Sequence, residues 1–205
     1  MCMYSRVAPW VCLGVLCAIG LGACSWSGGS GGRGPTKQVQ AATQDPTLGA
    51  LSARPLSLPR LPSGQPCPET TVRQVGPHNT SVLGDGPVYM LAVWRPAHDP
   101  KNPSKVAWLA DSTYAGPIRI RAGQVDGSGQ ILLGAPDNRG RGTPVKTIGG
   151  IGFYTELNLL EASSDTVPST RPWRLWPSST YIASAGCYAW EVDGLDFTEV
   201  ITSRA

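Results

Sequence analysis

The stretch Gly186-Cys187-Tyr188-Ala189-Trp190-Glu191-Val192-Asp193-Gly194-Leu195-Asp196-Phe197 decides the fold of this chain. It predicts two short strands joined at Asp193-Gly194, because this dipeptide between alternating apolar residues favours a two-residue hairpin turn. Tyr188, Trp190 and Val192 then share one face, which we expect at the centre of a hydrophobic core. Leu195 and Phe197 meet this face across the turn. Cys187, Ala189 and Glu191 point the other way, and we expect Glu191 to be exposed.

The chain after Cys67 continues in the same pattern of short apolar runs separated by glycine and proline. Ile118-Arg119-Ile120-Arg121 alternates apolar and charged residues, which predicts a sheet with one face in water. No convincing helix interrupts the eight to ten expected strands, so the pattern predicts an all-β fold, an antiparallel β-sandwich. The other expected strands are residues 88–94, 105–109, 130–133, 153–159, 173–176 and 180–183.

An immunoglobulin-like architecture is the natural model for such a sandwich. Cys67 and Cys187 bracket the domain, as cysteines do in antibody domains. Ala185, however, stands where those domains carry the tyrosine of the tyrosine corner. Cys187 also faces away from Tyr188, so a disulfide here should tie the start of the domain to a strand end, outside the aromatic core. The expected likeness is therefore architectural.

Composition and charge restrict the possible partners. The 205 residues include 25 glycines and 19 prolines, and only 15% are charged, which favours many turns and few polar helices. From Cys67 onward the chain has 12 Lys and Arg against 13 Asp and Glu, so the expected domain is nearly neutral. A nearly neutral domain argues against nucleic acid as a partner. We expect no cofactor and no metal.

The first 24 residues carry the features of an export signal. Arg6 precedes an apolar run over residues 7–21, which is short for a helix that must span ~30 Å of hydrocarbon. The run ends in Leu21-Gly22-Ala23-Cys24, which resembles the lipobox of bacterial lipoproteins. This resemblance implies cleavage before Cys24 and acyl chains such as palmitate on its diacylglyceryl group, which would anchor the protein in a membrane. An ordinary secretory signal or an uncleaved anchor are the alternatives.

The cysteines that remain after export form a single pair. Cys2, Cys12 and Cys17 lie within the signal segment, and Cys24 would carry lipid. This leaves Cys67 and Cys187, which we expect to form a disulfide in an exported protein.

Residues 24–66 have the composition of a flexible tether. Glycine and serine dominate its beginning, and prolines are spaced through its second half, with no period of 2 or 3.6 among its leucines. We therefore expect a signal peptide at residues 1–23, a lipidated tether at 24–66 and a β-sandwich domain at 67–205.

The C-terminal part of the chain is similar to the closing segment of a group of uncharacterised bacterial exported proteins. The shared pattern is Gly186-Cys187-Tyr188, then Val192-Asp193-Gly194, then Phe197. The resemblance covers residues 173–197 and implies no activity.

Few residues form a pattern typical of catalysis. His78 and His98 lie in turn-like segments without a hydrolase or zinc-protease motif, so we interpret them as solvated loop residues. Residues 140–147 resemble a phosphate-binding loop only superficially, because Pro144 removes an amide that such a loop needs. As a basic loop, they could contact an anion. A glycosidase would need two facing acids about 5 to 9.5 Å apart, and the candidates are Glu156, Glu191 and Glu199.

Tryptophans provide the remaining candidate site. Trp173 and Trp176 are three residues apart, so on a strand they face opposite sides and one of them could be exposed. An exposed indole could form an aromatic binding patch for a glycan or a protein ligand.

Together these features predict a lipid-anchored protein of the cell or outer membrane, with its domain on the extracytoplasmic side. The expected role is non-catalytic: binding, adhesion or structure in the cell envelope. Two alternatives stay open. One is an extracytoplasmic hydrolase of glycan or wall polymer that uses paired carboxylates. The other is an accessory or sensor subunit of a membrane complex.

Overall fold

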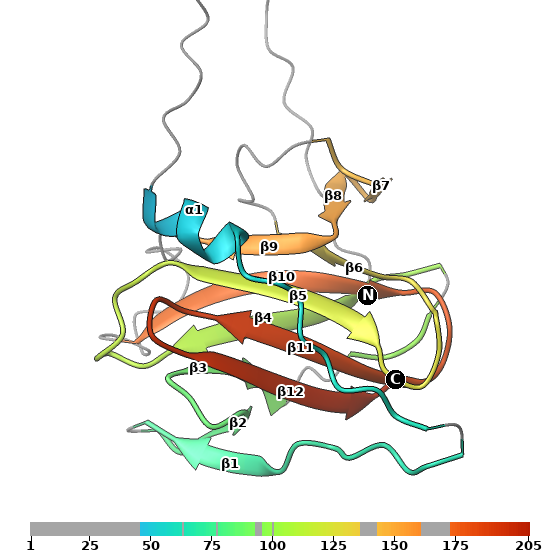
Figure 1. Ribbon diagram of the computed structural model, residues 1–205, viewed down its shortest axis with the longest axis horizontal. Helices are drawn as coiled ribbons and strands as arrows, with labels where there is room; N and C mark the ends of the chain where they lie inside the picture. Colours follow the sequence, from blue (N-terminus) through green and yellow to red (C-terminus); the bar gives the residue numbers. More distant parts are fainter. Residues whose placement is uncertain are drawn as a thin grey trace, which may run out of the picture. The chain divides into compact units, whose positions relative to one another are not determined.

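The computed structural model describes residues 46–62, 64–76, 78–92, 96–99, 101–135, 143–160 and 173–205. These residues form two antiparallel sheets packed face to face, which confirms the predicted all-β sandwich (Figure 1). The helix of the described part is α1 (Pro46–Ser52), a short element that the sequence pattern did not predict.

Strand order separates a large sheet from a small one. The large sheet has the order β1-β2-β3-β4-β10-β6-β8-β7, and the small sheet has the order β12-β11-β5-β9. The large sheet contains β1 (Val72–Val75), β2 (Thr80–Leu83), β3 (Val88–Leu91), β4 (Ser104–Ala110), β6 (Ile131–Gly134), β7 (Lys146–Ile148), β8 (Ile151–Tyr154) and β10 (Arg174–Ile182). The small sheet contains β5 (Ile118–Gln124), β9 (Glu156–Leu159), β11 (Cys187–Asp193) and β12 (Thr198–Arg204).

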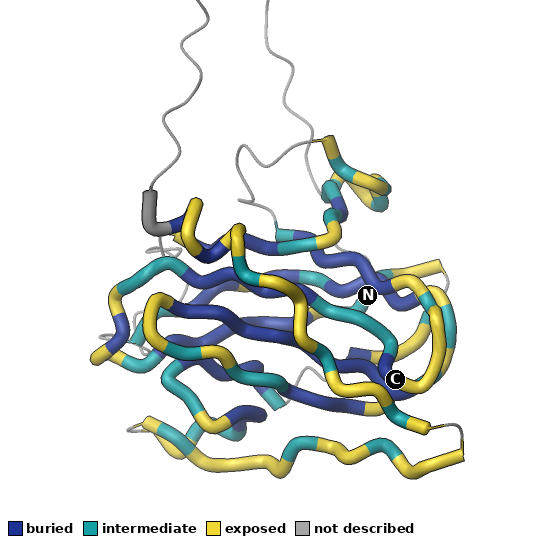
Figure 2. Tube along the Cα trace, in the orientation of Figure 1, coloured by how far each residue is buried: buried dark blue, intermediate teal, exposed yellow. Residues whose placement is uncertain are grey.

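The main hydrophobic core lies between the two sheets. Tyr188, Trp190 and Val192 of β11 are fully buried in it, as the alternation along that strand predicts. Trp108 of β4 and Trp176 of β10 enter the same core from the large sheet. In Figure 2 the central strands are accordingly almost continuous in the colour of buried residues. Strand β11, from the stretch that begins at Gly186, therefore forms the centre of the core.

The β11–β12 hairpin forms, but its connection is longer than the predicted two-residue turn. Asp193 pairs with Thr198, so Gly194 to Phe197 form the loop, which is closed by a 3.0 Å hydrogen bond from Gly194 N to Phe197 O. The Asp193 carboxylate accepts a 2.6 Å hydrogen bond from Thr198 Oγ1. This side-chain bond holds Asp193 in the ladder, and Leu195 lies in the loop, where it is exposed.

The prediction that residues 24–66 form a tether is wrong for the second half of this range. Residues 46–62, which we call the strap, run from α1 across the outer face of β5 and β11 (Figure 1). Leu48 and Leu51 are buried, and Leu58 and Leu61 pack beside Cys187. Prolines prevent a regular period, yet they suit an extended chain that binds through its backbone. The domain therefore begins before Cys67, whereas residues 24–45 lie outside the described part.

Candidate functional site

Two arginines lie beneath the strap on the outer face of the small sheet. Arg119 and Arg121 alternate with core residues along β5, as the sequence predicts. The expected contact of this face with water is wrong, because Arg119 and Arg121 are only 7% and 8% exposed. The strap covers them, so their charges need partners inside the protein.

Arg121 is the centre of a buried charge cluster. Its Nη2 donates to Asp193 Oδ2 at 3.0 Å and also to Glu191 Oε1. The same guanidinium donates to the backbone oxygens of Arg54 and Pro55 in the strap, each at 3.0 Å. It therefore joins β5, β11 and the strap.

Glu191 is buried, which corrects the expectation that it is exposed. Its exposed fraction is 1%, and its Oε2 accepts a 2.6 Å hydrogen bond from the backbone N–H of Ser57. The alternation along β11 places Glu191 correctly on the outer face. That face is closed by the strap, which the sequence pattern assigned to a tether.

Arg119 forms a second ion pair next to the first. Its Nε and Nη2 donate to Glu156 Oε2 at 2.9 and 2.7 Å, and its Nη1 donates to the backbone oxygen of Leu51 at 2.6 Å. Burial alone would raise the pKa of the Glu156 carboxyl. The hydrogen bonds from Asn158 and Arg119 and the nearby positive charges outweigh burial and hold this pKa below its usual value.

Arg54 attaches the strap to the hairpin loop. Its Nη1 donates to Gly194 O and its Nη2 to Leu195 O, both at 2.7 Å. Its Nη1 also lies 3.7 Å from Asp193 Oδ1. Three arginines thus face three acids, which makes the cluster neutral in formal charge: Arg54, Arg119 and Arg121 with Glu156, Glu191 and Asp193.

The cluster is chemically suited to hold a polypeptide backbone. Arg119 and Arg121 donate to carbonyl oxygens and Glu191 accepts an amide, so these three side chains recognise main chain at residues 51–57. Arg121 Nε and Asn158 Oδ1 are buried without a hydrogen-bond partner. The sequence did contain a signal for this cluster: two arginines on β5 and two acids on β11 share the non-core parity of adjacent strands.

The acids considered for glycosidic chemistry are each engaged elsewhere. Glu156 and Glu191 bind arginines in the cluster. Glu199 of β12 accepts hydrogen bonds from the backbone N–H groups of Asp85 and Gly86, where burial raises the pKa of its carboxyl. A carboxylate neutralised by a buried arginine is a poor general acid or nucleophile.

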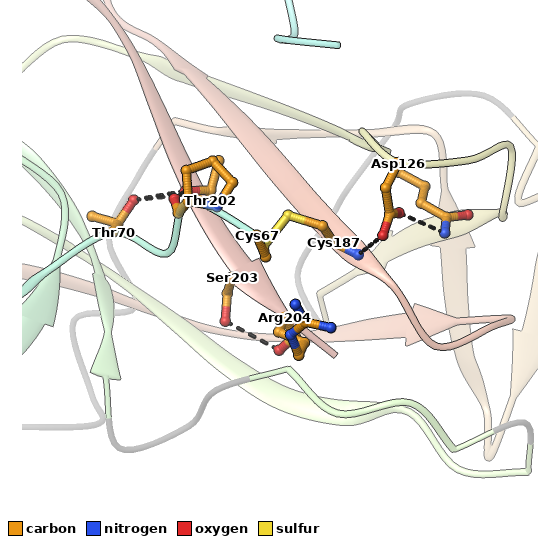
Figure 3. The surroundings of a disulfide bond; sticks show 9 residues. Cys67, Thr70, Asp126, Cys187, Thr202, Ser203 and Arg204 are labelled. Atoms are coloured by element: carbon orange, nitrogen blue, oxygen red, sulfur yellow. Dashed lines mark hydrogen bonds between the residues drawn. A yellow bond between two sulfur atoms is a disulfide. The ribbon is translucent and has the colours of Figure 1, made fainter. Parts of the chain in front are cut away.

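The disulfide between Cys67 and Cys187 is present in the structure, with a Cα–Cα distance of 5.4 Å (Figure 3). It lies on the outer face of the small sheet, at the first residue of β11, and not between the sheets as in antibody domains. Cys187 N donates to Asp126 Oδ2 at 3.0 Å, which lowers the pKa of the Asp126 carboxyl. Just after Cys67, Thr70 N donates to Thr202 O of β12 at 2.9 Å. The disulfide thus ties the end of the strap region to a strand end.

The two candidate tryptophans occupy opposite faces of the large sheet. Trp176 points into the main core and is 6% exposed, so it adds little to any surface patch. Trp173 packs on the outer face, with its ring centroid 6.1 Å from that of Tyr89, and is partly exposed. Tyr89 is itself buried, so the candidate aromatic patch reduces to Trp173.

The remaining candidates show no assembled chemistry. His78 and His98 are exposed, and His98 Nδ1 lies 3.1 Å from Ile182 O. Of the expected basic loop, residues 146–148 form β7 and pair with β8, while residues 140–142 are outside the described part. Within the described ranges, no cluster of three or more His, Cys, Asp or Glu could hold a metal.

One open pocket of about 580 Å³ borders the strap. It lies between strap residues 56–61 and the turn after β5, at Gln124 to Gly127. Its lining mixes leucine and valine side chains with Arg60 and Asp126, and it contains no pair of facing acids. The pocket shows no arrangement typical of an active site.

Two sequence expectations concern the membrane. Cys24, the expected lipidation residue, lies outside the described residues, and so does the whole lipobox. In the part of the chain that the structure describes, no helix combines the length and the apolar character required to cross a bilayer.

Comparisons with known proteins give little further information. No protein-family model matches the chain, and no curated protein matches it. Among solved structures, a similar chain is described as "X-ray Crystal Structure of a Putative Lipoprotein from Bacillus anthracis". It is 13% identical, with a TM-score of 0.33, over 68% of this chain and 88% of that chain.

Proposed function

We propose that the protein is a lipid-anchored, extracytoplasmic β-sandwich with a non-catalytic role in the cell envelope. Leu21-Gly22-Ala23-Cys24 follows an apolar run of the right length for a lipoprotein signal. The observation that carries the proposal is the Cys67–Cys187 disulfide, because disulfides persist in oxidising compartments outside the cytoplasm. An anchor at Cys24 and a disulfide at Cys67 belong to the same route of export.

A binding or structural role is supported by the way in which the acids are used. Glu156 and Glu191 neutralise arginines that hold the strap, and Glu199 binds the backbone of the loop before β3. These contacts stabilise the domain and leave no two of the three acids facing each other across a pocket. We therefore favour a recognition or scaffold role over glycan hydrolysis.

Trp173 is the proposed contact for a ligand. It lies partly exposed on the outer face of the large sheet, supported by Tyr89. Indole rings on flat sheet faces suit sugar rings and extended peptides, which stack on aromatic surfaces. An envelope glycan is the ligand class that we would test first.

Anchoring can be tested by replacing Cys24. Cys24→Ala should move the protein from the membrane fraction to the soluble extracytoplasmic fraction, and detergent phase partition should follow the same change. Cys17→Ala, within the signal, is the matched control and should leave the protein in the membrane. Retention of Cys24→Ala on membranes washed with high salt, with residues 1–23 removed as judged by its mass, would exclude a lipid anchor at this residue.

Ligand binding can be tested by sedimentation with insoluble wall glycan. Trp173→Ala should weaken the affinity by about tenfold, measured over a range of glycan concentrations, since one stacked aromatic contributes ~1–3 kcal/mol. Trp173→Phe should retain part of the binding, because a smaller ring still stacks. Equal binding by the wild type and Trp173→Ala would exclude Trp173 as the contact.

A further inference from the structure

We propose that the strap is releasable: residues 46–62 leave the outer face of the small sheet as a unit while the sandwich stays folded. Release would increase the number of residues between Cys24 and the first residue that is attached to the domain. The consequence for the distance between the membrane and the domain rests on the proposed lipid anchor. The opening of the strap does not, because it depends only on contacts within the domain.

The surface beneath the strap can tolerate water. Beneath residues 51–57 it carries polar and charged side chains: Arg119, Arg121, Glu191, Asp193 and Asn158. Beneath Leu58 and Leu61 it carries a small apolar cluster of Val125, Cys187 and Ala189. The main apolar core lies on the other side of the same sheet. Uncovering this face would hydrate charges that are now desolvated, and buried ion pairs add little net stability for that reason. Loss of the strap therefore exposes a largely polar surface with one small apolar cluster, and it leaves the main core closed.

Few apolar side chains hold the strap in place. Leu48 and Leu51 are buried, and Leu58 and Leu61 are half-buried against the disulfide region, whereas Leu56 is 48% exposed. Its other attachments are polar: bonds between its backbone and buried side chains, bonds from the Arg54 side chain to the β11–β12 loop, and the Arg54–Asp193 ion pair. Each of these bonds can be exchanged for a bond to water when the strap opens. In Figure 2 the strap is largely exposed where it crosses strands that are largely buried.

The disulfide at Cys67 limits how far the strap can separate from the sheet. Cys67 is bonded to Cys187, and Thr70 beyond it is paired with Thr202 of β12 through a backbone bond and a 2.8 Å bond from Thr202 N to Thr70 Oγ1 (Figure 3). Release that begins at α1 therefore stops at the disulfide. The chain N-terminal to Cys67 can separate from the sheet, and the pairing that follows Cys67 cannot be lost with it.

Release would change the distance over which the domain can act. With the strap bound, 21 residues separate Cys24 from Pro46, and with the strap released 42 residues separate Cys24 from Cys67. The greatest length that this segment can span would therefore roughly double.

Hydrogen exchange of the full-length protein tests the opening. In the wild type, the amides of Ala53 and Ser57 should exchange about tenfold or more faster than those of Trp190 and Val192 in β11. Leu51→Ala should accelerate exchange in the strap by a further tenfold or so and leave β11 unchanged. Leu56→Ala is the matched control, because this leucine is exposed, and it should change neither rate.

A second variant tests strap opening without removing a buried side chain, which in Leu51→Ala could destabilise the whole domain. Ser57→Pro removes the amide that donates to Glu191 and should accelerate exchange at Ala53 without affecting Trp190. Equal exchange rates for strap and β11 in the wild type would overturn the proposal. So would equal acceleration of both segments by both variants, because the strap would then be part of one cooperative unit.

Two further measurements distinguish failure of the strap proposal from failure of the lipid-anchor proposal. The same exchange pattern in soluble Cys24→Ala protein would support strap release even if the lipid anchor proved wrong. For the anchored protein on vesicles, energy transfer from a dye at Ser128 to a membrane dye should fall in Leu51→Ala and stay constant in Leu56→Ala. Unchanged transfer in Leu51→Ala would overturn the consequence for the distance between the membrane and the domain.

Discussion

The Nη2 atom of Arg121 lies 3.0 Å from Oδ2 of Asp193, and both side chains are buried on the outer face of the small sheet. They stand on neighbouring strands, β5 and β11, where cross-strand side chains of the same parity lie close together. Glu191 shares the same guanidinium. The outer face of the sheet is therefore held by charge pairing, whereas its inner face is held by apolar packing.

Removal of this arginine should be costly. Arg121→Met leaves Glu191 and Asp193 buried without their cation, and loss of one partner of a buried pair costs about 3–5 kcal/mol. Urea unfolding measures the change. Arg73→Met is the matched control, because Arg73 pairs with Asp85 at 2.8 Å with side chains 56% and 80% exposed, and an exposed pair contributes ~0–1 kcal/mol. A similar small loss in both variants would contradict the importance of the cluster.

The disulfide should contribute more stability than any single surface contact. Cys67 and Cys187 are 120 residues apart in sequence, and closing so long a loop stabilises the folded state by ~4–5 kcal/mol in the chain-entropy model. The double variant Cys67→Ala/Cys187→Ala should lose about this amount in denaturant unfolding. The wild type with reductant is the control and should unfold like the double variant. Free thiols in the unreduced wild type would show that the bond is not formed.

The two tryptophans should differ strongly in their effect on folding. Trp176 fills the main core, so Trp176→Ala should destabilise the protein by about 3–5 kcal/mol. Trp173 is partly exposed, so Trp173→Ala should cost only about 1 kcal/mol. Thermal unfolding of the two variants compares them directly. A loss for Trp173→Ala as large as that for Trp176→Ala would mean that Trp173 is a structural residue and a poor candidate for ligand contact.

The sequence predicted those parts of the fold that depend on local alternation. Tyr188, Trp190 and Val192 face the core because every second residue of a strand lies on one side. The strands expected at 173–176 and 180–183 are parts of one strand, β10, which continues through Pro177. Its partner β6 pairs only from Ser179 onward, so Pro177 has a neighbouring strand on one side, where a missing N–H is tolerated.

The strap could not be predicted in the same way. Its contacts join residues far apart in sequence, such as Ser57 with Glu191, and they use backbone atoms that every residue possesses. The prolines that indicated a tether carry no information about what lies beneath an extended chain. The burial of Arg121 and Glu191 cannot be read from the alternation for the same reason, since burial of an outer face depends on the segment that covers it.

Two glutamates should give stability opposite dependences on pH. The pKa of Glu156 lies below its usual value of 4.5 despite burial, because hydrogen bonds and arginine charges favour the ionised form. The folded chain then binds fewer protons than the unfolded chain just below this pH, so the Glu156 contribution is present above pH ~4.5 and lost on acidification. For Glu199, burial raises the pKa against the opposing amide bonds. Its contribution therefore decreases as the pH rises from ~4.5 through the folded pKa.

Urea unfolding of two isosteric variants between about pH 3 and 7 checks this contrast. Glu156→Gln should remove part of the rise in unfolding free energy between acid and neutral pH, because the stabilising ionised form is lost. The wild type should lose unfolding free energy as the pH rises above ~4.5, because the buried Glu199 carboxyl ionises. Glu199→Gln should remove this loss, because glutamine does not ionise. Comparison of each curve with the wild type isolates one carboxyl. If both variants changed the pH slope in the same direction, burial would not control Glu199, and the contacts of its carboxylate with the amides of Asp85 and Gly86 would outweigh desolvation.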